Sequence, residues 1–254
     1  MGKNIEAGAA NIIAENVRAV NERIAAAAAR AGRSAADITL VAVSKTRTTD
    51  EIESAIEAGA LDLGENKVQE ITDKYDILRI FTEKPSKNRN IRWHMIGHLQ
   101  RNKVKYIVDK VSLIHSVDSF RLADEINRRA AAAGVTMDIL LQINPADEES
   151  KFGVAMEDAR RLADEVVAGC GNVRVKGLMT IVPIADDPNE VRKYFREMKR
   201  IYDKIGREAM CERLDFEWLS MGMTHDFEVA IEEGANMVRV GTGIFGPRAY
   251  AQSA

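Results

Sequence analysis

The chain has 254 residues, of which 46% are hydrophobic, and a formal net charge of −3 at pH 7. This length and apolar content suffice for a large core, whereas the charge and a pI near 5.9 give no electrostatic support for binding nucleic acid or an anionic membrane. No stretch approaches the roughly 20 apolar residues of a membrane span, and two cysteines without metal-ligand spacing indicate a reduced, cytoplasmic protein.

Residues 3–31 are rich in alanine and glutamate, and their isoleucines and valines recur at helical spacing until Gly32. This pattern predicts one long amphipathic helix. Apolar runs then alternate with helical patterns along the rest of the chain. The runs predicted as strands are 38–44, 61–65, 91–97, 112–117, 137–143, 175–182, 217–223 and 237–245. The helices expected between them are 50–58, 66–79, 100–108, 119–133, 157–168, 188–208 and 226–233.

The alternation of strands and helices predicts an α/β fold with a parallel sheet and crossover helices. A count of eight strands favours a closed (β/α)8 TIM barrel over the alternative, a doubly wound open sheet. We expect a single domain over residues 1–254, in which the helix within residues 1–32 packs on the barrel in the place of a last helix. The polar segment 81–90 contains a proline and is expected to be a surface loop.

Lys45 directly follows the first predicted strand. In parallel α/β folds, the carboxyl ends of the strands carry the chemistry. Partial desolvation at this rim lowers the pKa of a lysine, and the neutral amine can form a Schiff base with a carbonyl. The alternative is a lysine whose stem lies along the sheet while its charge reaches solvent.

Two glycine-containing segments mark the ends of the last two predicted strands. Ser220 and Gly222 belong to the first, and Gly241, Thr242 and Gly243 belong to the second. Glycines let backbone N–H groups approach an anion closely, and barrels often bind phosphate at these two loops. We therefore expect both segments to bind a phosphate group. The alternative is that the glycines only permit tight turns.

Arg239 lies inside the eighth predicted strand, two residues before the second glycine segment. A structural ion pair is one explanation, and a permanently protonated donor that faces a ligand atom is the other. An imine-forming lysine, a phosphate site and a fixed arginine together favour pyridoxal 5′-phosphate (PLP). In this interpretation, Lys45 binds the aldehyde and Arg239 faces the ring nitrogen.

Longer motifs resemble one family of proteins. They span residues 41–46, 64–70, 93–103, 115–118, 151–153, 177–180, 220–227 and 239–246. Through them the chain is similar to the pyridoxal phosphate homeostasis proteins. The resemblance implies a fold-type III barrel like the N-terminal domain of alanine racemase, with PLP held as an internal aldimine. The cofactor-binding residues that it implies are Lys45, Asn66, His94, Ser220, Met221, Gly222, Arg239, Gly241 and Thr242.

The same resemblance implies a PLP carrier in vitamin B6 and amino-acid homeostasis, without catalytic turnover. PLP-dependent apoenzymes would be the recipients, and the protein would be a monomer or weak dimer. A PLP-dependent racemase-like enzyme is the alternative, but arginine at the ring nitrogen weakens the electron sink. The second base that the resembled racemases use is a tyrosine of a further domain, and here only Tyr250 lies near the last strand. A cofactor-free Schiff-base aldolase would need a carboxylate or lysine relay around Lys45, and none is evident in the sequence.

Overall fold

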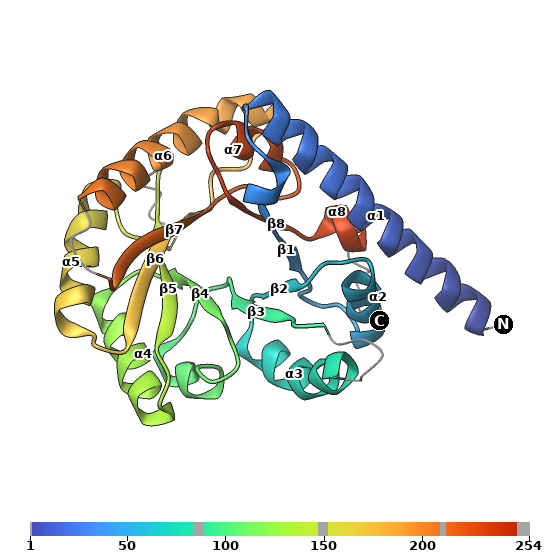
Figure 1. The fold of residues 1–254 in the computed structure, drawn as a ribbon, viewed down its shortest axis with the longest axis horizontal. Coiled ribbons are helices and arrows are strands. Elements are labelled where there is room, and N and C mark those ends of the chain that lie inside the picture. The colour runs from blue at the N-terminus through green and yellow to red at the C-terminus, as the bar shows by residue number, and fades with distance from the viewer. Residues whose placement is uncertain (1, 84–88, 147–151, 209–211, 248–254) are drawn as a thin grey trace, which may run out of the picture.

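Eight parallel strands form a closed barrel in chain order (Figure 1). The computed structural model describes residues 2–83, 89–146, 152–208 and 212–247. The strands are β1 (Thr39–Val43), β2 (Asp62–Glu65), β3 (Arg92–Met95), β4 (Leu113–Val117), β5 (Met137–Ile143), β6 (Val173–Thr180), β7 (Leu214–Ser220) and β8 (Met237–Val240). β1 pairs with β8 in parallel register and closes the ring. The predicted (β/α)8 barrel is confirmed.

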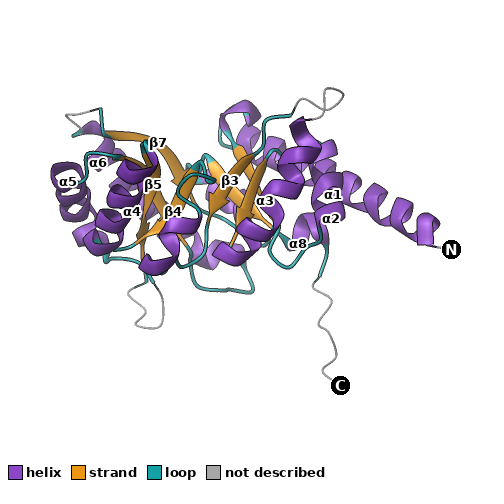
Figure 2. Cartoon of the chain, turned by 90° about the horizontal axis from the view of Figure 1, so that it is seen from below, coloured by secondary structure: helices purple, strands orange, loops and turns teal. Residues whose placement is uncertain are grey.

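The helices lie outside the strands (Figures 1 and 2). The α-helices are α1 (Gly2–Arg30), α2 (Thr49–Glu57), α3 (Val68–Glu83), α4 (Phe120–Ala133), α5 (Ala159–Gly169), α6 (Arg192–Arg207), α7 (Phe227–Glu232) and α8 (Thr242–Phe245). Short 3-10 helices are η1 (Ala35–Asp37), η2 (Arg101–Tyr106), η3 (Met156–Asp158) and η4 (Pro188–Val191). Among the described residues, no helix is long and apolar enough to cross a membrane.

Three predicted elements differ in the structure. Residues 101–106 form a 3-10 helix instead of an α-helix; a 3-10 helix rises about 2.0 Å per residue against 1.5 Å, so these residues span more of the distance between β3 and β4. β8 ends at Val240, because the chain turns at Gly241 into the short helix α8. α3 continues to Glu83, into the predicted loop 81–90, of which residues 84–88 lie outside the described part.

The apolar interior of the barrel is separate from the core between strands and helices. Val41, Leu113, Leu140, Met179 and Met237 form one buried cluster inside the ring. The larger cluster fills the space between the strands and the surrounding helices. Buried polar side chains on five of the strands build the site described below: Asp62, His94, His115, Ser220 and Arg239.

Helix α1 packs along the outside of the barrel against α2, α7 and α8 (Figure 1). It buries one stripe of small and branched side chains at helical spacing: Val17, Val20, Ile24, Ala27 and Ala28. α1 therefore covers the sector of the barrel that a last helix was expected to cover.

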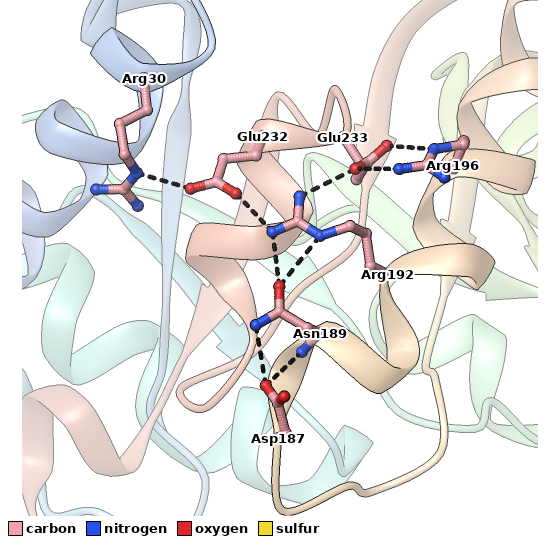
Figure 3. Close-up of polar contacts among 7 residues, drawn as sticks. All are labelled: Arg30, Asp187, Asn189, Arg192, Arg196, Glu232 and Glu233. Atoms are coloured by element: carbon pink, nitrogen blue, oxygen red, sulfur yellow. Dashed lines mark hydrogen bonds and ion pairs between the residues drawn. The ribbon is translucent and has the colours of Figure 1, made fainter.

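An ion-pair network ties the end of α1 to the barrel (Figure 3). Arg30 donates to one carboxylate oxygen of Glu232 at 2.7 Å, and Arg192 donates to the other at 2.8 Å. Arg192 also binds Glu233, which in turn accepts from Arg196. Hydrogen bonds from Arg192 and Arg30 lower the pKa of Glu232 below its usual value. α1, α6 and α7 therefore meet at one shared carboxylate.

We expect Glu232→Gln to lower the free energy of unfolding by about 1 kcal/mol, the upper range for an exposed ion pair, because it weakens two ion pairs at once. Urea unfolding would measure the loss, which we expect to shrink in 1 M salt through screening. Glu165→Gln is the control, since within the described part of the chain the ion pair of Glu165 is with Arg161 alone, at 3.4 Å on the exposed face of α5. A loss unaffected by salt would contradict an electrostatic role for Glu232.

Candidate functional site

The predicted site segments meet at one edge of the barrel. Lys45 is half-buried just beyond β1, and Asn66 directly follows β2. On the other side of β1, a Cβ atom added to Gly241 would lie 3.4 Å from the Cβ of Val43. The backbone N–H of Arg239 donates to the carbonyl of Gly222 at 3.0 Å. The strand ends of β1, β7 and β8 are therefore neighbours, as the sequence predicted.

The two glycine segments have different structural requirements. Gly222 has a φ of +92°, and a Cβ there would lie 2.6 Å from the Cβ of Ala230 on α7, so packing alone requires glycine. Gly241 has a φ of −111°, a conformation open to any residue. The hydroxyl of Thr224 accepts from the N–H groups of Gly241 and Gly243, both at 3.4 Å, and joins the two loops. The tight-turn explanation therefore suffices for Gly222 but not for Gly241.

Ser220 and Met221 support this edge from inside the protein. The Ser220 hydroxyl contacts Arg239 and the ring of His115 and is fully buried. The N–H of Met221 donates to the carbonyl of Met237, and its side chain lies in the core. The side chains of both residues are therefore committed to internal contacts.

Arg239 is a buried cation held by neutral acceptors. It is 4% exposed and donates to the Ser220 hydroxyl at 2.6 Å and to the carbonyl of Thr180 at 2.8 Å. Burial lowers its pKa to about 10, and the nearby charge of Asp226 opposes this shift. Among the described residues, no carboxylate lies within ion-pair distance of it. A structural ion pair therefore does not explain Arg239, and its unused N–H donors fit a ligand that offers an acceptor.

A continuous set of polar side chains crosses the barrel interior beneath Arg239. We call it the interior network; in order of contact it comprises Arg92, Asp62, His94, His115, Ser220 and Arg239. Burial alone would raise the pKa of Asp62, but hydrogen bonds from His94 and Arg92 outweigh it and lower this pKa. Burial holds the pKa of His115 well below its usual value, and the positive charge of Arg239 acts in the same direction. His94 thus reaches Arg239 through His115 and Ser220, with both of its ring nitrogens engaged.

The backbone that carries Lys45 makes an unusual turn. Thr46 has a φ of +64°, which is unique among the non-glycine residues described. Its N–H donates to Glu70 at 2.6 Å. On the other side of Lys45, the carbonyl of Ser44 accepts from the ammonium of Lys74 at 3.0 Å.

The side chains around this turn form a buried cluster, which we call the Lys74 cluster: Ser44, Glu65, Glu70 and Lys74. Lys74 donates to Glu65 at 2.7 Å and to Glu70 at 2.9 Å, and the Ser44 hydroxyl donates to Glu65 at 2.8 Å. Burial raises the pKa of Glu65 above its usual value, although hydrogen bonds from Lys74 and Ser44 oppose the shift.

The Lys74 cluster corrects an expectation from the sequence, which showed no charged relay around Lys45. Two carboxylates and a lysine do lie against the neighbouring backbone. They were missed because they belong to β2 and α3, which fold back onto the end of β1. The spacing of Glu70 and Lys74, four residues apart at the start of a helix, is the pattern that could have indicated them.

The rim has an open side next to Asn66. A cavity of about 340 Å³ lies there, lined also by Lys67, His98 and Lys103. Lys151, the first residue of the motif 151–153, and Tyr250 lie outside the described residues. The tyrosines within the described part lie on helices: Tyr75, Tyr106, Tyr194 and Tyr202.

Comparisons with known proteins agree with this geometry. The model of the alanine racemase N-terminal domain family matches residues 15–249. A pyridoxal phosphate homeostasis protein from Aquifex aeolicus is 44% identical over 236 residues, which are 93% of this chain and 98% of the relative. A protein of the same name from Escherichia coli is 38% identical over 242 residues, 95% of this chain and 99% of the relative.

A solved structure of a PLP-binding protein is also similar to this chain over nearly its full length. PipY from Synechococcus elongatus, determined with PLP bound, is 31% identical and superimposes with a TM-score of 0.76, over 92% of this chain and 100% of that one. The match is thus nearly full length in both directions. Together with the barrel and the residues at its rim, these similarities show that the chain belongs to the family of pyridoxal phosphate homeostasis proteins, with the fold of the alanine racemase N-terminal domain.

Proposed function

We propose that this protein binds PLP on Lys45 as an internal aldimine and serves in PLP homeostasis without catalytic turnover. The observation that carries the proposal is Arg239, a buried guanidinium with neutral partners and unused donors on the strand next to β1. In the covalent step, the Lys45 amine attacks the aldehyde carbon, a C=N bond replaces the C=O bond, and water leaves. The names of the relatives and PLP-bound PipY support PLP binding and a role in PLP homeostasis.

The phosphate site of this proposal lies at the two loops after β7 and β8. The N–H of Thr242 is the first of helix α8 and has no acceptor within that helix. Gly241 has no side chain that could cover its backbone, and its φ does not itself require glycine. Gly222 shapes the facing loop, and Ser220 and Met221 fix that loop from below. The N–H of Thr242 is thus a backbone donor that this edge offers to a phosphate group.

The contacts to the cofactor ring come from two directions. Arg239 keeps its proton and therefore meets the ring nitrogen as a donor, which leaves that nitrogen unprotonated. Asn66 is a direct contact at the rim, whereas His94 acts from the interior through His115. An unprotonated ring nitrogen is a weak electron sink, and carbanion chemistry depends on a strong one.

The second candidate function is a racemase-like enzyme using the same cofactor. It is favoured only by the fold, because the chain matches the alanine racemase domain over residues 15–249. Tyr202 donates to the carbonyl of Phe216 and Tyr75 packs near Trp93, so neither serves as a base at the rim. We therefore favour a carrier that delivers PLP to apoenzymes in the cytoplasm, as a monomer or weak dimer.

Absorbance spectroscopy tests the proposal directly. PLP added to the purified protein should give a visible band that borohydride bleaches, and peptide mass mapping should then find the reduced adduct on Lys45. Assays for turnover of amino acids would separate carrier from enzyme. Absence of both band and adduct would refute PLP binding on Lys45, and turnover at ordinary enzymatic rates would refute the carrier.

A further inference from the structure

The two ends of the interior network have fixed hydrogen-bonding roles. A guanidinium can only donate and an ionised carboxylate can only accept. Arg239 therefore donates to the Ser220 oxygen at 2.6 Å. At the opposite end, Asp62 begins β2 and accepts from the Nε2 atom of His94 at 2.9 Å, so this nitrogen carries a hydrogen.

The roles of the central groups follow from these ends. If His94 is neutral, its Nδ1 atom is an acceptor, so the Nε2 atom of His115, 2.9 Å away, must donate. The Nδ1 atom of His115 is then an acceptor as well, and the Ser220 hydroxyl donates to it across 3.1 Å. In this arrangement, each hydrogen between Arg239 and Asp62 has an acceptor.

The reverse arrangement leaves a hydrogen without a partner. A doubly protonated His94 would donate from its Nδ1 atom to the Nε2 atom of His115. The hydrogen of His115 would then lie on Nδ1, and Ser220 would receive hydrogen bonds from both His115 and Arg239. The Ser220 hydrogen would then lose its acceptor within the network. Ser220 is fully buried, so water cannot replace that acceptor, and an unsatisfied buried hydroxyl is unfavourable.

We infer that the interior network has one fixed direction and that its two histidines, both neutral, are positioning residues for Arg239. Aligned hydrogen bonds polarise one another, so the charge of Asp62 strengthens the bond that holds the guanidinium. Thr180 fixes the second terminal nitrogen, and the two bonds set the plane of the group. This role rests on the proposed function, because the positioned guanidinium is the group that meets the PLP ring.

Nuclear magnetic resonance of ¹⁵N-histidine protein without cofactor tests the direction. The sequence has four histidines, so His94→Asn and His115→Asn suffice to assign the two buried rings. Both should carry hydrogen on Nε2 and a lone pair on Nδ1. A His115 ring with its hydrogen on Nδ1 would overturn the proposed direction, whether or not the protein binds PLP.

Asp62→Asn tests the positioning role from the opposite end of the barrel, without touching the cofactor site. We expect the dissociation constant of PLP to rise about tenfold, by analogy with the loss in metal affinity when a metal ligand loses its outer hydrogen-bond partner. We also expect the absorption maximum of bound PLP to shift. Asp138→Asn is the matched control, because Asp138 on β5 binds Arg174 on β6 with two hydrogen bonds, as Asp62 binds Arg92.

The outcomes separate this inference from the proposed function. Failure of the unaltered protein to bind PLP refutes the proposed function, while the histidine spectra still decide the direction of the network. Binding that is unchanged in Asp62→Asn, or equally weakened in Asp138→Asn, refutes the positioning role. A selective loss in Asp62→Asn, with a shifted absorption maximum, supports it.

Discussion

In the Lys45→Ala variant, we expect complete loss of the borohydride-reducible PLP adduct while the barrel stays folded. The amine that forms the C=N bond is absent, and alanine cannot replace it. Lys45 is half-buried at the rim, so its truncation leaves no core cavity and should change the free energy of unfolding by less than about 1 kcal/mol. Absorbance with added PLP and mass mapping after reduction measure the adduct, and urea unfolding measures the free energy of unfolding.

A matched lysine at the same rim controls for nonspecific imine formation. Lys67 is exposed and lines the cavity next to Asn66. Lys67→Ala should keep the full adduct on Lys45. Undiminished adduct in Lys45→Ala, or loss of the adduct in Lys67→Ala, would show that the reactive amine is not that of Lys45. Noncovalent PLP that remains in Lys45→Ala would measure the binding that the phosphate loops, Arg239 and Asn66 provide without the covalent bond.

The barrel could be predicted because its information is local in the sequence. Each strand is a short apolar run and most helices have clear apolar periodicity, so alternation and count were sufficient. The errors occurred where local pattern was ambiguous. Ile244 and Phe245 are β-prone, yet the chain turns at Gly241 and they form part of α8. The segment 101–106 likewise has helical composition but adopts the tighter 3-10 geometry.

The candidate site could be predicted only in its outer parts. Lys45, Asn66, Gly241 and Thr242 are found at strand ends, as a barrel requires. The interior network was not predictable, because which side chains meet across a barrel depends on the stagger of its strands. His94 was expected next to the cofactor, but it binds Asp62 and His115 inside the ring. Its role toward the cofactor remains a prediction.

The Lys74 cluster makes the second large prediction. Lys74→Met keeps the apolar stem of the side chain and removes an ammonium that binds Ser44, Glu65 and Glu70. Glu65 is fully buried, and its Oε2 atom has no hydrogen bond even in the intact protein. We expect a loss of about 3–5 kcal/mol in the free energy of unfolding, the cost of leaving a buried charge without its partner. Urea unfolding with an unchanged slope would measure it.

A second change and a control distinguish charge from packing. Adding Glu65→Gln to Lys74→Met removes the stranded charge and should recover part of the loss, because a neutral amide costs less to bury than a carboxylate. Arg79→Met on the same helix should cost less than about 0.5 kcal/mol, since Arg79 is exposed and contacts Asp76 only at 3.9 Å.

The cluster also links stability to the site, because its contacts fall on both residues next to Lys45. Without Lys74, the carbonyl of Ser44 loses its donor. Glu70 also loses the cation that positions its carboxylate to accept from the N–H of Thr46, the residue with the strained backbone. The positive φ of Thr46 should then relax, and PLP should react more slowly with Lys45 even at temperatures where the variant is fully folded. A stable Lys74→Met protein with an unchanged rate of adduct formation would show that the turn holds its shape without the cluster.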